Sequence, residues 1–210
     1  MILVAITLES PKHLKQFQPY LSILQERYAP FLGQNVTEIE PGKWVSSVKP
    51  FHAGIFPYLC LDAMIYTGQA HSKLYFANDI LDFSINQEVS PSDFGRLVQQ
   101  NKGSFSPKSI QACCLYQGFG RRIDMALNAI ARLVFDSLHS LTKVETDVLR
   151  ELRRLQFEQY KDPCITRTYG LQKHVAGKLK KSPVAVHKSL KSSKYELLSD
   201  SANTMRSILA

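Results

Sequence analysis

Residues 167–194 read RTYGLQKHVAGKLKKSPVAVHKSLKSSK, and this stretch is typical of a helix-turn-helix. Its apolar spacing predicts a first short helix over residues 170–179 and a second helix that begins at Pro183. Lys180 and Lys181 would form the turn between them.

Local signals define the second helix and its inner face. Ser182 can cap the helix through its hydroxyl, and a proline is favoured at the first helical position that follows. Val186 and Leu190 are four residues apart, so they share one face of the helix. We expect this face to pack on Ala176 and Leu179 of the first helix.

Basic residues are concentrated in the same segment. Between Pro163 and Tyr195 there are eight Lys or Arg residues and no Asp or Glu. The chain has a net charge of +8, of which +7 lies after residue 140. A localised basic surface on a helical hairpin favours binding to the phosphate backbone of DNA. The alternatives are a solvated lysine-rich face and a surface that binds an acidic protein.

The expected mode of binding is insertion of the second helix into the major groove of double-stranded DNA. His187, Lys188 and Lys191 would face base edges or nearby phosphates, and flanking lysines would hold the backbone. A single such hairpin covers only a few base pairs, so we expect a homodimer. The predicted DNA-binding residues are Lys173, Lys178, Lys180, Lys181, Ser182, Ala185, His187, Lys188, Lys191 and Lys194.

A length of 210 residues suggests one large or two small domains, and a second domain that starts at Leu141-Thr142 gives the division into residues 1–140 and 141–210. The chain is 44% hydrophobic, which is enough for a real core. The sequence contains no signal peptide pattern and no run of about 18 apolar residues, so we expect no membrane partner. None of the four cysteines forms a CxxC pair, which favours reduced thiols in a cytoplasmic protein.

The first domain is predicted to be α+β, with a ferredoxin-like order of elements: strand, helix, hairpin, helix and strand. We expect a small-molecule ligand or dimer contacts on this domain. The predicted elements are a strand at 2–7, a helix region from Pro11 to Gly33, a hairpin at 35–48, a buried helix at 51–66, a strand from Lys73, and helices at 92–100, 109–116 and 123–138.

The second domain is predicted to be all-α, with four helices and no two-stranded wing. Thr142 and Glu145 have the spacing of a capping box that begins its first helix, and Lys161 to Pro163 would end that helix. The last helix would contain Leu197 to Ile208.

The C-terminal region resembles the helix-turn-helix of sigma-factor region 4, of LuxR-type regulators and of the SatD-like family. The matching residues are LTKVETDVLREL at 141–152 and the pattern A-x-x-L-x-x-S-x-x-x-V-x-x-x-L at 176–190. The sequence departs from this pattern at Lys180, where a glycine is usual, and at Lys181, where an apolar residue is usual. The resemblance implies a DNA-binding transcriptional regulator.

The SatD-like resemblance extends to AITLES at 5–10 and to a hairpin at Gly42 to Val45, and it implies a cyclase-like N-terminal domain. In cyclases, a carboxylate after the first strand and another at the hairpin hold divalent cations. Here Leu8 or Glu9 stands at the first position and Lys43 at the second, which implies a non-catalytic relative.

Other catalytic motifs are missing from the sequence. It contains no GxxxxGK[ST], GxGxxG or GxSxG pattern, and its six histidines lack metal-ligand spacing. Asp79 and Asp82 form the best carboxylate pair of the first domain, although such pairs at a loop edge are usually solvated. We therefore expect no enzymatic activity, no cofactor and no metal. The alternative function is a nucleotide-binding or cyclase-like protein with a helical tail.

Overall fold

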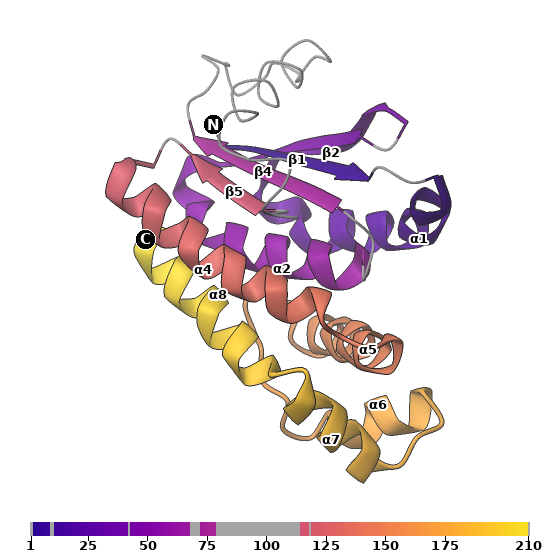
Figure 1. Ribbon diagram of the computed structural model, residues 1–210. Coiled ribbons are helices and arrows are strands. Elements are labelled where there is room, and N and C mark those ends of the chain that lie inside the picture. The colour runs from indigo at the N-terminus through magenta and orange to yellow at the C-terminus, as the bar shows by residue number, and fades with distance from the viewer. Residues whose placement is uncertain are drawn as a thin grey trace.

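A computed structural model describes residues 2–8, 11–41, 43–67, 72–78, 114–117 and 119–209 (Figure 1). In chain order the main elements are β1 (Ile2–Leu8), α1 (Pro11–Tyr28), β2 (Leu32–Glu40), β3 (Lys43–Val48), a 3-10 helix (Pro50–Ile55), α2 (Phe56–Thr67), β4 (Ser72–Asn78), β5 (Cys114–Gln117), α4 (Arg121–His139), α5 (Lys143–Tyr160), α6 (Gln172–Lys178), α7 (Pro183–Ser192) and α8 (Tyr195–Leu209).

The five described strands form one sheet in the order β2-β3-β1-β4-β5. β1 pairs antiparallel with both β3 and β4, so that Ile2 lies opposite Val48 on one side and Asn78 on the other. β5 adds to the edge parallel to β4. Helices α1 and α2 lie against one face of this sheet, and Trp44 and Val48 are fully buried.

The predicted order of strand, helix, hairpin, helix and strand is present over residues 2–78. The predicted helix at 51–66 is divided into a 3-10 helix and α2. The predicted helix at 109–116 is wrong where it can be checked, because Cys114–Gln117 is a strand. The predicted helix at 92–100 and the Asp79 and Asp82 pair lie outside the described residues.

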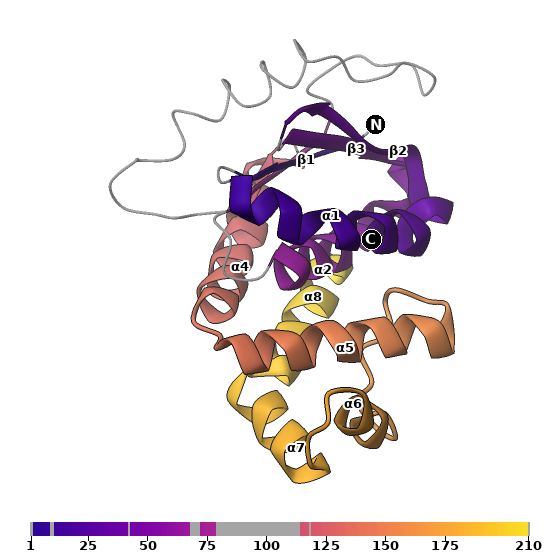
Figure 2. The same cartoon turned by 90° about the vertical axis from the view of Figure 1, so that its right-hand side faces the viewer.

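The predicted fold class, an α+β ferredoxin-like or cyclase-like domain followed by a separate all-α domain, needs correction. Helices dominate the described chain: α1, α4 and α5 are 18 or 19 residues long, whereas its longest strand has nine residues. The C-terminal helices also continue the helical layer, because α8 contacts α2 and α4, and α5 contacts α2. Leu198, Ala202 and Met205 bury the inner face of α8 in these contacts. The protein is thus mostly helical, with one sheet along one side (Figure 2).

Helix α5 begins and ends as the sequence predicts. The Thr142 side chain accepts a hydrogen bond from the Glu145 N–H, and the Glu145 carboxylate accepts one from the Thr142 N–H, which completes the capping box. The helix ends at Lys161, whose backbone adopts a left-handed conformation with φ of 55°. The α6–α7 hairpin follows beyond α5, at the end of the molecule farthest from the sheet (Figures 1 and 2).

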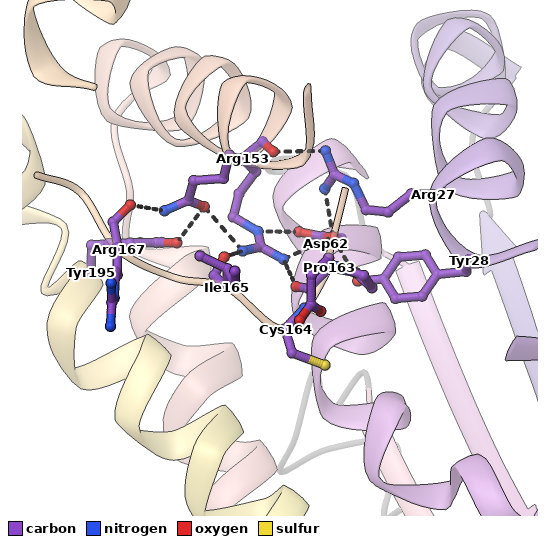
Figure 3. A network of polar contacts seen from close by, with 11 residues as sticks. Arg27, Tyr28, Asp62, Arg153, Pro163, Cys164, Ile165, Arg167 and Tyr195 are labelled. Carbon is purple, nitrogen blue, oxygen red and sulfur yellow. Dashed lines mark hydrogen bonds and ion pairs between the residues drawn. The ribbon is translucent and has the colours of Figure 1, made fainter. Parts of the chain in front are cut away.

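A buried ionic network joins α5 to the N-terminal helices (Figure 3). Asp62, in the middle of α2, is fully buried and forms ion pairs of 2.6 Å with Arg27 of α1 and with Arg153 of α5. The Tyr28 hydroxyl donates a third hydrogen bond to the carboxylate at 2.6 Å. One carboxylate therefore organises three helices around itself.

Arg153 extends this network toward the hairpin. Its guanidinium donates to the carbonyls of Pro163 and Ile165, at 2.8 and 2.9 Å, in the segment that leads into α6. It also donates to the Gln156 side-chain carbonyl, which accepts a second hydrogen bond from the Tyr195 hydroxyl at the start of α8. The network thus determines where the chain enters α6 and leaves α7.

Burial alone would raise the pKa of the Asp62 carboxyl, but the charges of Arg153 and Arg27 and the hydrogen bonds from Arg153 and Tyr28 outweigh it and hold this pKa below its ordinary value. A depressed pKa stabilises the fold at every pH above the ordinary carboxyl range. The contribution is lost as the pH falls through the folded-state value.

We predict that Asp62→Asn lowers the free energy of unfolding by about 3–5 kcal/mol, because it leaves two buried guanidiniums without an anion. Urea denaturation at neutral pH measures the loss. Asp200→Asn on the exposed side of α8 is the matched control and should change stability by less than about 0.5 kcal/mol. Equal stability of the two variants would contradict the network.

Candidate nucleic-acid interface

Helices α6 and α7 form the predicted hairpin, with a shorter first helix than expected. Helix α6 spans Gln172–Lys178 instead of residues 170–179, and α7 begins at Pro183 as predicted. The Ser182 hydroxyl oxygen accepts a hydrogen bond of 3.1 Å from the Ala185 N–H, which makes it the N-cap of α7. The cap and the proline explain why the helix begins there.

The inner face of the hairpin is buried as the spacing predicts. Val175 and Val186 are fully buried, and Ala176 and Leu190 are 2% and 7% exposed. Leu179 is half-buried. Helix α5 packs on both helices of the hairpin, so its Leu149 and Leu152 complete the same core. This apolar packing fixes which side of α7 faces outward.

Most of the predicted DNA-binding residues lie on the surface of the hairpin. Two members of the set are only partly exposed. They are Ala185, in the first turn of α7, and Lys181, in the turn between the helices. The exposed members of the set are Lys173, Lys178, Lys180, Ser182, His187, Lys188, Lys191 and Lys194. Of these eight, the structure brings His187, Lys191 and Lys194 together along one cleft, which Glu196 also lines.

The turn between the helices takes a left-handed conformation at Lys180, where φ is 52°. The Lys181 N–H donates to the Ala176 carbonyl at 2.9 Å, and the Lys180 N–H donates to the Gly177 carbonyl at 3.3 Å. These two bonds form a Schellman-type helix end, in which glycine is the preferred residue at the left-handed position. The lysine that replaces the usual glycine therefore keeps the turn geometry at a conformational cost.

A cleft lies between α7 and the N-terminus of α8. Its volume is about 330 Å³, and it is open to solvent beside the predicted basic residues. The lining residues are Thr168, Gln172, His187, Leu190, Lys191, Lys194, Tyr195 and Glu196. The sequence pattern did not indicate Thr168 and Gln172, before and at the start of α6, or Glu196 in α8, because it followed only the apolar and the basic residues of the hairpin.

Two exposed apolar side chains were also missed. Tyr169, just before α6, is 93% exposed, and Val184, in the first turn of α7, is 64% exposed. Single exposed apolar residues are ordinary on protein surfaces. In this case both border the basic region, where an aromatic ring and a branched methyl group suit contact with sugars, bases and thymine methyl groups. Each of them is next to a residue that marks the predicted start of a helix, Gly170 for Tyr169 and Pro183 for Val184, and this was the signal available in the sequence.

The positions compared with cyclase cation ligands are only partly described. Lys43 lies opposite Thr7 in the pairing of β1 with β3 and opposite Glu40 in the hairpin, so it is close to the end of β1. Glu9 lies outside the described residues.

Over the described ranges there is no cluster of three or more His, Cys, Asp or Glu residues that could hold a metal ion. In that same part of the chain, no helix combines the length and apolar character needed to cross a membrane.

We predict that Leu190→Ala destabilises the helical region by about 2–5 kcal/mol, because it empties a buried position in the hairpin core. Lys188→Ala changes an exposed side chain two residues away and should cost less than about 0.5 kcal/mol. Thermal melts followed by circular dichroism compare the two. Equal melting temperatures would mean that α7 is rotated from the orientation described.

We also predict that Lys180→Gly raises the free energy of unfolding by roughly 1 kcal/mol, because glycine adopts a positive φ without a Cβ clash. Lys188→Gly is the matched control, since the same substitution inside exposed α7 should cost about 1 kcal/mol. Denaturant midpoints of the two variants should therefore move in opposite directions. A lower midpoint for Lys180→Gly would contradict the role assigned to the left-handed turn.

The chain matches no protein-family model, and searches of curated proteins and of solved structures found no match either. The SatD-like resemblance therefore stays a prediction.

Proposed function

We propose that the chain binds double-stranded DNA through α7 and acts as a cytoplasmic transcriptional regulator. The observation that supports this most strongly is the polarity of the hairpin. One side of α7 is fixed by Val186 and Leu190 in a buried core, while the other side presents His187, Lys188 and Lys191 to solvent. A lysine-rich helix held by its inner face is suited to enter a groove without losing its fold.

The composition of the surface supports DNA rather than a general solvated face. Eight basic residues occur without an acidic neighbour in the sequence from Pro163 to Tyr195, whereas α5 balances its cations with carboxylates. On α5, for example, Arg154 pairs with Glu151 at 2.5 Å and also with Glu158. The hairpin lysines are thus the charges that remain available for phosphates.

The proposed contacts follow from position on α7. Lys188 and Lys191 would reach base edges or the phosphates beside them, and Val184 would contact thymine methyl groups. The Ser182 hydroxyl accepts from the Ala185 N–H and retains its own proton, which it can donate to a phosphate at the start of the helix. Lys173, Lys178 and Lys180 would hold the flanking backbone.

The absence of enzymatic activity stays a prediction, as does the small-molecule ligand of the N-terminal region. A specific acidic protein partner would use the same lysines, so the decisive experiment must compare DNA with other polyanions.

We predict that the full chain shifts random genomic fragments in an electrophoretic assay at 50 mM salt. If five to seven phosphates are contacted, affinity should fall roughly 10³-fold between 50 and 200 mM salt. Lys188→Ala with Lys191→Ala should weaken binding at least about tenfold and reduce the magnitude of the salt slope by about two.

Lys49→Ala is the control, because Lys49 directly follows β3, and the hairpin lies at the end of the molecule farthest from that strand's sheet (Figure 2). It should bind DNA like the parent chain. Absence of any shift at 50 mM salt, or equal loss in Lys49→Ala and the α7 double variant, would exclude α7 as the DNA-binding element. Equal binding to heparin and to duplex DNA would favour a surface for acidic partners in general.

A further inference from the structure

Helix α4 exposes a second apolar face that is separate from the hairpin. Its inner face packs on α2 and α8 and contains Leu127, Ala131, Val134 and Leu138, each no more than 6% exposed. On the opposite side, Met125 and Leu133 are each 66% exposed. Packing on α2 and α8 therefore accounts for the apolar residues of the inner face. It does not account for Met125 and Leu133, which are in contact with solvent.

The exposed face consists of residues at helical spacing. Arg122, Met125, Ala129, Leu133 and Asp136 are all exposed and are three or four positions apart, so they follow one line along the helix. The line is about 21 Å long at 1.5 Å per residue. Single exposed apolar residues need no explanation, but this face also has complementary charges at its two ends.

The order of residues on this face is self-complementary about Ala129. Met125 and Leu133 lie four residues on either side of it, and Arg122 and Asp136 lie seven residues on either side. An antiparallel copy centred on Ala129 would place Met125 against the partner's Leu133 and Arg122 against the partner's Asp136. Because a two-fold interface makes every contact twice, both apolar pairs and both ion pairs are formed together.

A small residue lies where the two helices would cross. Ala129 is exposed and has only a methyl group, so two such helices can approach closely at this point. Ala126 is also small and exposed, on the flank of this face. A parallel arrangement would instead place each Arg122 beside the partner's Arg122, which is repulsive.

We propose that the exposed face of α4, residues Arg122, Met125, Ala129, Leu133 and Asp136, is a homodimer surface that pairs with the same helix of a second copy in an antiparallel arrangement. α4 and α7 are separate elements, and the hairpin lies at the far end of the molecule (Figures 1 and 2). The proposal does not depend on DNA binding, and it can hold even if α7 binds another polyanion.

Charge reversal tests the predicted pairing. Arg122→Asp faces the partner's Asp136 with a second carboxylate, and Asp136→Arg faces the partner's Arg122 with a second guanidinium. Both side chains are exposed, so the variants should fold, and circular dichroism can check this. The double variant Arg122→Asp with Asp136→Arg restores opposite charges across the two-fold axis.

The measurement is sedimentation equilibrium of the full chain up to about 100 µM, where a micromolar dimer is populated. The parent should approach twice the chain mass of 23.8 kDa. Each single reversal should raise the dissociation constant at least about tenfold, and the double variant should return to within about threefold of the parent. A monomeric parent would overturn the proposal. A dimer that the single reversals leave unchanged, or that the double variant does not recover, would also overturn it.

Discussion

The placement of the helices depends on one buried carboxylate. Asp62 is surrounded by Arg27, Arg153 and Tyr28, which come from α1 and α5, and no part of its side chain reaches solvent. Removing one partner of a buried ion pair leaves a charge without compensation, which is far more costly than losing a surface pair. The helices must therefore keep their relative positions for the network to remain satisfied.

This constraint connects the sheet side of the protein to the α6–α7 hairpin. Arg153 is bound by Asp62 on one edge and by the carbonyls of Pro163 and Ile165 on the other. Arg150 adds a second link, since it donates to the carbonyls of Ile65 and Tyr66 at the end of α2. The segment that enters the hairpin is therefore held by hydrogen bonds to α5, and α5 is held by ionic and hydrogen-bond contacts to α2.

Arginine and lysine are used for different purposes in this protein. Arg27 and Arg153 are buried, and their planar guanidiniums satisfy several acceptors at once, which lysine cannot do. Seven of the eight basic residues from Pro163 to Tyr195 are lysines, which suits phosphate contacts that need a point charge on a flexible stem. The net charge of the chain therefore does not show that the buried arginines hold the fold together while the lysines of the hairpin face solvent.

The hairpin could be predicted because its signals are local. The buried network could not be predicted, because its contacts join residues far apart in the sequence. The capping box at Thr142, the Ser182 cap and the spacing of Val186 and Leu190 act within a few residues, and the structure has each of them. Asp62 could not be identified as the centre of a network, because it lies in an apolar run and its partners Arg27 and Arg153 are 35 and 91 residues away.

The fold class was wrong for a related reason. The sequence shows that α8 has an apolar face but not what covers it, so the contacts by which α8 adds to the helices α2 and α4 could not be predicted. The end of the predicted helix at 109–116 belongs to the strand Cys114–Gln117, because a run of four residues cannot distinguish the two periods.

The most direct test of the central claim is lysine acetylation footprinting of the full chain with and without saturating duplex DNA, read by mass spectrometry. If α7 enters DNA, Lys188 and Lys191 become protected while Lys49, directly after β3, reacts at the same rate in both samples. Unchanged reactivity of Lys188 and Lys191, or equal protection of all three lysines, would contradict the assignment of α7 as the element that enters DNA.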